Sequence, residues 1–303
     1  MFETPIPLFT SLPPRITRRN KHGEDIGEHY AASCFQSWQD SGFQPVTLNA
    51  ASEDLSALSM PAAIDRRTLA RDAGAVYGKP LPYFGDIIAE MKKHGDGVVA
   101  LTNADIMLRL DAEDRRILRS LRPGQCIVSN RMDIDTPENR TGEIYFHGFD
   151  FFALHTADLP DRLSDDLVFG MPWWDHFLPL WLYLSGLERV QISMDAVLHL
   201  RHDERWDSAN WTAIGQRFLN ILSSHLETRP VATDRCAAYF SQVQDIPNFF
   251  RLHALRVALR NLTRRGRVRN RKKKLQRLSR VNEKHLAEWD MRHSETYTHD
   301  GAE

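Results

Sequence analysis

Along the first part of the chain, short apolar runs alternate with amphipathic stretches. The runs at 5–10, 43–50 and 97–106 have the length and composition of strands. Between them, residues 24–41 and 83–95 repeat apolar side chains every three or four positions, which predicts helices. In the first of these stretches the repeat consists of Ile26, Tyr30, Cys34 and Trp38. This alternation predicts an α/β fold in which helices flank a mostly parallel, Rossmann-like sheet.

The pattern changes from strands to helices along the rest of the chain. Residues 124–134 and 143–154 each predict one further strand, and a short helix is expected to start at Ser52, with acidic residues in its first turn. Beyond these strands the pattern becomes predominantly helical. We therefore predict a sheet domain over residues 1–210 and a helical C-terminal extension over residues 211–303.

The composition is that of an ordinary folded protein, with 42% hydrophobic and 26% charged residues. Its three cysteines are widely spaced and form no CxxC pair, which favours a reducing compartment. The most apolar segment, Phe177–Leu187, is shorter than the roughly 18–20 residues that span a bilayer, and the N-terminus does not resemble a signal peptide. We expect a cytoplasmic protein.

The net charge of −1 conceals a strongly basic segment. Residues 251–280 contain 13 Lys/Arg and no Asp/Glu, leaving 26 basic against 40 acidic residues elsewhere. Leu252, Leu255, Leu259 and Leu262 lie on one helical stripe of this segment. This stripe either docks on the acidic remainder of the protein or lies on the inner face of an anionic membrane. Nucleic-acid binding is less favoured, because the basic run has no interleaved aromatic residues.

Polar side chains stand at the ends of three predicted strands: Thr10 and Ser11, then Asn49, then Asn103 and Asp105. Ligands of open α/β sheets bind beyond the carboxyl ends of the strands, so these ends predict a cleft. Taken alone, the break at Asn103 is typical of a turn or a helix cap. On an extended backbone, however, Asn103 and Asp105 face the same way and can converge on one ion or ribose.

Six segments occur in an ordered series over about residues 5–210: "LFTSLPPRI", "SWQDSGFQPVTLNAASE", "YFGDIIAEM", "VVALTNADIML", "GEIYFHGFDFFALH" and "LVFGMPWWDHFLPLWLYLSG". The series resembles the nucleotide-binding half of GT-A-type nucleotide-sugar glycosyltransferases. In that family a short acidic motif, DxD, ends a central strand and holds a divalent metal against the donor diphosphate. The resemblance implies a GT-A-like fold and Mn²⁺ or Mg²⁺ on Asp105, although Asn103 is an amide where the motif has its first acid.

The resemblance also implies contacts with the donor. Asp150 follows Gly148, where the backbone can approach a ligand closely, and would bind hydroxyls of the donor sugar. Arg131 would neutralise phosphate charge or bind an acidic acceptor, although an ordinary salt bridge explains it equally well. The residues expected to hold the nucleotide come from the first strand end and from a helix: Thr10, Ser11, Arg15 and Asp86. A solvated helix position is the alternative for Asp86.

"PWWDHF" places Asp175 between two tryptophans and an apolar helix. Burial raises the pKa of a carboxyl group, which suits a general base for an acceptor hydroxyl, and the resemblance implies that role in inverting transfer. Trp173 and Trp174 would offer a platform for the apolar face of a sugar. The alternative for Asp175 is an N-cap, since Asp before an apolar helical run is a common cap.

"LHLRHDERWD" contributes two histidines, His199 and His202, at a spacing from which both can reach one metal ion. The resemblance implies that a late histidine is the third metal ligand, and His202, which Asp203 follows, is the better candidate. A hydrolytic zinc site is an alternative, but the third ligand of an HExxH motif is missing. An ordinary hydrogen-bonded role also remains open for either histidine.

The sequence therefore predicts a glycosyltransferase that moves a sugar from a nucleotide-sugar donor to a glycan or lipid-linked cell-envelope acceptor. Two alternatives stay open. One is a nucleic-acid-binding protein led by residues 251–280. The other is a non-catalytic protein that binds nucleotide sugars and has lost its metal site, which the amide of Asn103 would allow.

Overall fold

The computed structural model of the chain describes residues 4–20, 22–56, 58, 61, 63–139, 141–146, 148–161, 163, 167–202, 208–226, 232–244 and 264–296. The chain divides into two compact units. The first comprises Met1–Asp175 and Glu188–Arg205, and the second comprises His176–Leu187 and Trp206–Glu303.

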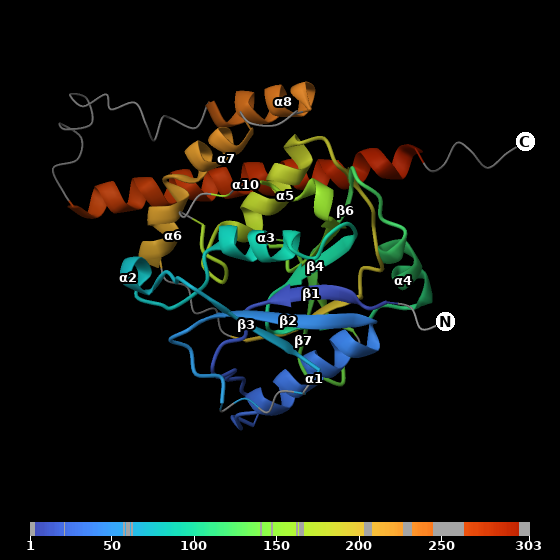
Figure 1. The fold of residues 1–303 in the computed structure, drawn as a ribbon. Helices are drawn as coiled ribbons and strands as arrows, with labels where there is room; N and C mark the ends of the chain where they lie inside the picture. Colours follow the sequence, from blue (N-terminus) through green and yellow to red (C-terminus); the bar gives the residue numbers. More distant parts are fainter. Residues whose placement is uncertain are drawn as a thin grey trace, which may run out of the picture. The chain divides into compact units, whose positions relative to one another are not determined.

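A seven-stranded sheet of order β10-β6-β9-β4-β1-β2-β3 forms the centre of the first unit (Figure 1). Neighbouring strands are parallel except at β9, which runs antiparallel to both β4 and β6. The structure therefore confirms an α/β fold with a mostly parallel sheet flanked by helices. The strands are β1 (Ile6–Thr10), β2 (Phe43–Ala50), β3 (Asp65–Leu69), β4 (Val98–Thr102), β6 (Gln125–Ser129), β9 (Phe151–His155) and β10 (Glu188–Arg189).

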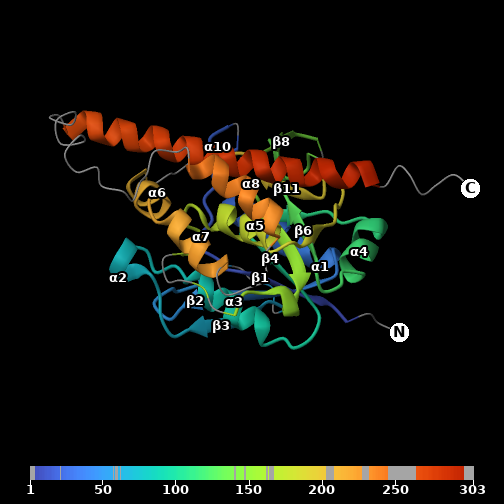
Figure 2. The ribbon, with the colours of Figure 1, turned by 90° about the horizontal axis from the view of Figure 1, so that it is seen from above.

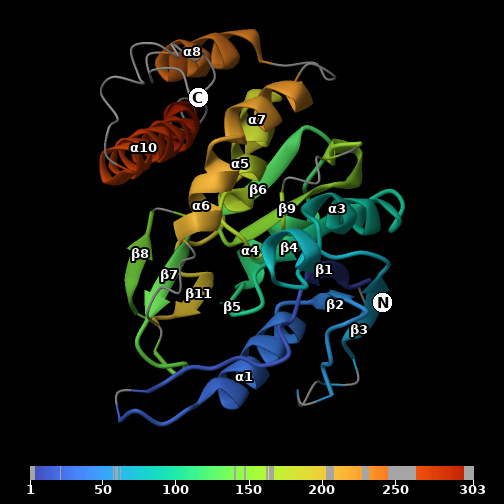
Figure 3. The same ribbon diagram turned by 90° about the vertical axis from the view of Figure 1, so that its left-hand side faces the viewer.

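Helices cover both faces of this sheet (Figure 1 and Figure 3). Helix α1 (Gly27–Asp40) lies on one face and α3 (Phe84–Lys92) on the other. The spacing predicted for α1 is confirmed, because Tyr30, Cys34 and Trp38 are fully buried in the core beneath it. The shorter helices of this unit are α2 (Gly74–Tyr77), α4 (Ala112–Arg119) and the 3-10 helix η1 (Thr156–Asp158).

A second, four-stranded sheet of order β5-β11-β7-β8 lies in the same unit. Its register pairs His199 with Ile106 on one side and with Asp133 on the other. Directly opposed residues share a face of a sheet, so this register brings His199 and Asp133 together. The strands are β5 (Ile106–Leu108), β7 (Arg131–Ile134), β8 (Glu143–Tyr145) and β11 (Val197–Leu200).

Three sequence predictions differ from the structure in detail. The strands predicted over 124–134 and 143–154 each divide between the two sheets, because a period-two pattern does not reveal where a chain crosses from one sheet to another. The helix predicted to start at Ser52 is wrong, since the described residues there form turns. The Glu53 carboxylate instead accepts hydrogen bonds from the Ala50 N–H (3.2 Å) and the Asn49 side chain (2.9 Å), which closes a turn after β2.

The second unit is helical where the structure describes it. Tyr183, Tyr239 and Trp289 are buried in its interior, where the Tyr239 hydroxyl donates to Asn282 Oδ1 (2.8 Å), and α10 runs alongside α8 (Figure 2). Residues 251–263 of the basic segment, with its leucine stripe, lie outside the described residues. None of the described helices is long and apolar enough to cross a membrane. The helices are α5 (Trp174–Leu184, which begins in the first unit), α6 (Ser208–Gly215), α7 (Phe218–Leu226), α8 (Thr233–Gln244) and α10 (Arg264–Thr296).

Candidate functional site

The turn that follows β4 is fixed by one buried phenol. β4 ends at Thr102, and residues 103–105 turn the chain into β5. The hydroxyl of Tyr30, on α1, donates to the backbone carbonyl oxygen of Asp105 (2.7 Å) and accepts from the N–H of Leu200 (2.8 Å). Tyr30 therefore holds the Asp105 turn against the end of β11, the strand that carries His199.

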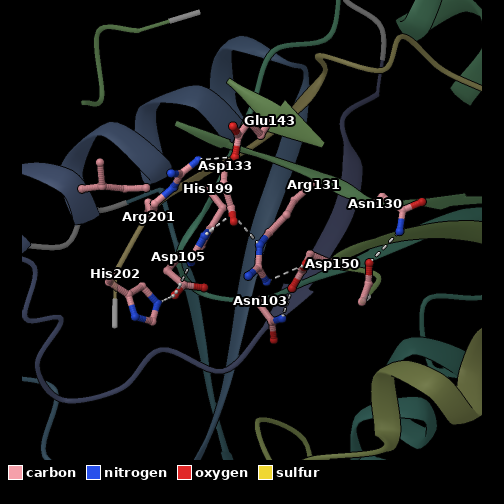
Figure 4. A network of polar contacts seen from close by, with 12 residues as sticks. Asn103, Asp105, Asn130, Arg131, Asp133, Glu143, Asp150, His199, Arg201 and His202 are labelled. Carbon is pink, nitrogen blue, oxygen red and sulfur yellow. Dashed lines mark hydrogen bonds and ion pairs between the residues drawn. The ribbon is translucent and has the colours of Figure 1, made fainter. Parts of the chain in front are cut away.

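Three potential metal ligands converge at this point: Asp105, His199 and His202, with one donor atom from each lying within 4.8 Å of the others. Asp105 Oδ2 is 3.5 Å from His199 Nε2 and 3.8 Å from His202 Nε2, and the side chains point toward one another (Figure 4). One carboxylate and two imidazoles suit a divalent transition-metal ion, and three protein ligands leave coordination positions for a substrate.

The second ring nitrogen of His199 is anchored by a carboxylate. His199 Nδ1 lies 2.9 Å from Asp133 Oδ1, and the His199 side chain is only 5% exposed. Donation from Nδ1–H to Asp133 leaves the Nε2 lone pair facing Asp105, which is the tautomer that a metal ligand requires. The donor set and its supporting hydrogen bond thus fit a divalent metal.

Arg18 provides a cation at the same site. Its guanidinium forms an ion pair and a hydrogen bond with Asp105 Oδ2, the oxygen that also faces the two histidines. The Arg18 side chain is 12% exposed, and its Nε is buried without a hydrogen-bond acceptor among the described residues. Asp105 is therefore already paired with a positive charge.

The charges of this cluster perturb the pKa of two of its members. Burial opposes ionisation of Asp105, but the facing imidazoles of His199 and His202 and the charge of Arg18 hold its pKa well below the ordinary value. Burial likewise opposes protonation of His199, but the carboxylates of Asp105 and Asp133 raise its pKa above the ordinary value. Both shifts show that the site favours positive charge beside Asp105.

Arg131 connects the metal-ligand cluster to Asp150. Its Nε donates to Asp133 Oδ1 (2.9 Å) and its Nη1 donates to Asp150 Oδ2 (3.0 Å), as Figure 4 shows. Burial disfavours the guanidinium charge, but the two carboxylates outweigh it and raise the pKa of Arg131. The guanidinium also lies 4.2 Å from the centroid of the Tyr145 ring. Arg131 is thus a fixed bridge between two carboxylates.

The structure explains why residue 103 is an amide. Asn103 Nδ2 donates to Asp150 Oδ1 at 2.6 Å, a contact that a carboxylate at this position could not make without repulsion. Residues 103–105 turn the chain, so the extended backbone on which Asn103 and Asp105 were expected to converge is not present here. Asn103 faces Asp150, and Asp105 faces the histidines.

Asp175 lies next to this network. A Cβ atom at Gly148 would be 3.6 Å from Asp175 Oδ2 and 3.3 Å from Tyr145 Cε1, so the Asp175 carboxylate lies close to the ring that covers Arg131. Helix α5 begins at Trp174, which places Asp175 inside the first turn and not at the N-cap, the alternative role considered for it. Trp173, the residue before the first residue of α5, has a φ of 83°, an uncommon backbone conformation for a bulky residue.

The tryptophans beside Asp175 are core residues, which corrects the predicted sugar platform. Trp173 and Trp174 are each 2% exposed, and the Trp174 ring packs against Phe152 and Phe169. The apolar residues around Trp173 and Trp174 in the sequence already indicated that these two side chains are buried. The exposed aromatic ring nearest to this site in sequence is Phe146, which is 63% exposed and follows Tyr145.

The residues predicted to hold the nucleotide are more dispersed. Thr10 is fully buried, its hydroxyl has no partner among the described residues, and Ser11 beside it is half-buried. Arg15 pairs with Asp25 (2.9 Å), whose other oxygen accepts from the backbone N–H of Arg18 (3.1 Å), so Arg15 supports the loop that carries Arg18.

Asp86 belongs to a separate ion pair. Arg71 Nε and Nη2 each donate to its carboxylate at 2.9 Å, and the Arg71 guanidinium lies over the Tyr83 ring (4.7 Å). Its contacts therefore support the alternative of a structural charge on α3, and its nucleotide role stays a prediction.

Of the predicted site residues, the structure brings Asn103, Asp105, Arg131, Asp150 and His202 into one network. Sequence reasoning missed three further members, which are Arg18, Tyr30 and Asp133, and it preferred His202 to His199 as the metal ligand. The i, i+2 spacing of Arg131 and Asp133 on a strand was an available signal that they share a face. Tyr30 carried no such signal, because its position on the apolar stripe of α1 indicated only burial.

No protein-family model matches this chain, and no curated protein matches it either. Among solved structures, it is similar to HddC from Yersinia pseudotuberculosis, with 14% sequence identity and a TM-score of 0.30 over 53% of this chain and 81% of HddC. The same protein complexed with GMP-PN gives 15% identity and a TM-score of 0.29 over the same shares. No function follows from similarity at this level. A function for this chain has to be inferred from the geometry of the site.

Proposed function

We propose that this chain is a GT-A-like glycosyltransferase that takes a sugar from a nucleotide-sugar donor. The observation that carries the proposal is the convergence of Asp105, His199 and His202 at the turn after a central strand of an α/β sheet. The carboxyl ends of such strands are where ligands of α/β sheets bind. The network of Arg131 and Asp150 extends this site and supports a role in holding the donor.

Asp105, His199 and His202 would hold the divalent metal, and two imidazoles among three ligands favour Mn²⁺ over Mg²⁺, which prefers oxygen. When bound, the ion would neutralise charge on the diphosphate leaving group. Asp133 would fix the orientation of His199, and Tyr30 would fix the backbone of Asp105. The chain thus contributes ligands, their orientation and the charge balance around them.

Asp175 would act as the general base. Its carboxylate would take the proton of the acceptor hydroxyl, whose oxygen bonds to the anomeric carbon while the bond from that carbon to the diphosphate breaks. The diphosphate leaves with the electron pair, and attack opposite to it inverts the anomeric centre. The position of Asp175 beside Tyr145 and Gly148 would put the acceptor close to Asp150, which would bind hydroxyls of the donor sugar.

The acceptor is proposed to be a glycan or lipid-linked envelope molecule at the inner face of a membrane. Lys272, Lys273 and Arg277 of α10 are exposed, whereas Leu275 and Leu278 are buried within the helical unit. Since those apolar side chains are already packed, adsorption would be electrostatic and weakened by salt. Sedimentation with anionic vesicles at about 0.1 M and about 0.5 M salt tests this point, with neutral vesicles as the control.

The proposed function is tested by thermal stability against a panel of nucleoside diphosphates, with and without Mn²⁺. A ligand that binds only the folded state raises the melting temperature. We expect Asp105→Ala to abolish the Mn²⁺-dependent rise. Asp195→Ala is the matched control, because Asp195 pairs only with Arg109 among the described contacts and is 48% exposed. No stabilisation of the wild type by any diphosphate with Mn²⁺ would contradict the proposal.

A second variant separates chemistry from binding. Asp175→Asn should lower the turnover of the nucleotide-sugar donor by about 10²–10⁴-fold, the range expected for loss of a general base. Its affinity for Mn²⁺ should stay at the wild-type value, because Asp175 is not among the converging metal ligands. Unchanged turnover in this variant would remove Asp175 from the mechanism.

A further inference from the structure

Arg18 places a permanent positive charge beside the proposed metal ligands. Its guanidinium is bonded to Asp105 Oδ2, the same oxygen that lies 3.5 Å and 3.8 Å from the two histidine nitrogens. Arg is permanently cationic and cannot ligate a metal. An ion bound by Asp105 and the histidines would therefore stand against a like charge on Arg18.

We propose that Arg18 is an internal counter-ion of the metal site, which pairs with Asp105 in the metal-free protein and binds the donor diphosphate once a divalent cation takes its place. The second half of this inference rests on the proposed function. The first half, competition between Arg18 and a cation for Asp105, concerns metal binding alone.

The contacts of Arg18 are suited to such an exchange. Its backbone N–H is held by Asp25 Oδ1 (3.1 Å), a contact that does not involve the guanidinium, so the loop stays fixed when the guanidinium moves. Its Nε is buried and has no acceptor among the described residues. A buried donor without a partner gains most from an incoming anion, and a phosphate oxygen matches the fork of a guanidinium.

The charge of the site also changes sign when a cation binds. Arg18 and Arg131 stand against the carboxylates of Asp105, Asp133 and Asp150, which leaves one net negative charge when both histidines are neutral. A divalent cation makes the balance positive by one charge. The site then attracts a diphosphate, and Arg18, released from Asp105, can donate to it.

The experiment measures Mn²⁺ binding by calorimetry, with pyrophosphate as the minimal diphosphate. R18Q and R18M both remove the charge, so one suffices if the other does not fold. We expect either to bind Mn²⁺ alone on the order of tenfold more tightly than the wild type. At saturating Mn²⁺, the same variants should bind pyrophosphate at least about tenfold more weakly, because a charge-assisted donor is lost.

R18K, which keeps the charge, should retain wild-type Mn²⁺ affinity. R109Q is the matched control, since it removes an arginine that pairs with Asp195 outside the site, and it should change neither affinity. Mn²⁺ affinity that is unchanged or lower in both neutral variants overturns the inference.

The two proposals fail in different ways. If neither the wild type nor a neutral variant binds Mn²⁺, the metal site and this inference fail together. If the expected opposite shifts occur but no nucleotide sugar is consumed, the exchange at Arg18 holds and the glycosyltransferase proposal fails.

Discussion

Replacing Tyr30 by Phe removes one oxygen atom and leaves the ring in place. That oxygen donates to the carbonyl of Asp105 (2.7 Å) and accepts from the N–H of Leu200 (2.8 Å). It therefore connects α1, the turn after β4 and the end of β11.

The expected loss in the free energy of unfolding follows from the burial of Tyr30 and Leu200. Tyr30 is 0% exposed and Leu200 is 2% exposed, so water cannot replace the lost hydroxyl easily. Each hydrogen bond contributes about 0.5–1.5 kcal/mol net, and a buried polar group left unpaired costs about 1–3 kcal/mol. Since these terms overlap, we expect Tyr30→Phe to lower the free energy of unfolding by about 2–4 kcal/mol.

The effect of Tyr30→Phe is measured by the melting temperature and by the affinity for Mn²⁺. For a unit of this size 1 kcal/mol corresponds to about 2–4 °C, so the melting temperature of the first unit should fall by about 4–16 °C. The Tyr30 hydroxyl supports both Asp105 and Leu200, the residue after His199. Because both lose this support, Mn²⁺ affinity should fall by about tenfold or more, as for other outer-shell partners of metal ligands.

Tyr239→Phe provides the control. Tyr239 is also fully buried, but its hydroxyl donates only to Asn282 in the helical unit. Its loss leaves the buried Asn282 oxygen unpaired and should cost about 1–3 kcal/mol, but Mn²⁺ affinity should stay unchanged. A Tyr30→Phe protein with wild-type stability and wild-type Mn²⁺ affinity would refute the role assigned to this hydroxyl.

Three further substitutions test the rest of the network. Asn103→Asp places a carboxylate where the amide donates to Asp150 at 2.6 Å, so denaturation should show a loss of about 1–3 kcal/mol at pH 7. Wild-type stability of this variant would argue against repulsion between the two carboxylates. Asp133→Asn weakens the acceptor for His199 Nδ1, so calorimetry should show Mn²⁺ affinity lowered about 10–100-fold, and an unchanged value would exclude Asp133 as its support. Arg131→Gln leaves two carboxylates uncompensated and should lower the free energy of unfolding by about 2–4 kcal/mol; full stability in urea would show that the bridge is dispensable.

Local patterns in the sequence predicted the elements that depend on local burial. The strand at 43–50 has the bounds of β2, and the stripe of Tyr30 and Trp38 predicted α1. Periodicity succeeds in these cases because side chains two, three or four residues apart face the same neighbour. The same reasoning placed Asn103 and Asp105 at a strand end, although it assumed an extended backbone where the chain turns.

Motifs predicted the polar residues of the site more successfully than their partners. The polar break after β4 drew attention to Asp105, and the spacing of two histidines drew attention to His202. The sequence offered no reason to join either of them to Arg18 or Asp133. An arginine in a loop and an aspartate on a strand are ordinary surface residues until the fold gives them a neighbour.

The sequence by itself determined the α/β alternation, the burial of the helix stripes, and which strand ends carry polar groups. These follow from the chemistry of residues that are close along the chain. Only the tertiary structure decided that Arg18 reaches Asp105 across 87 positions, that Asp133 orients His199 across 66, and that Tyr30 supports Leu200 across 170. The physical reason is that such contacts depend on sheet register and on where the chain crosses between two sheets, which no pattern of neighbouring residues specifies.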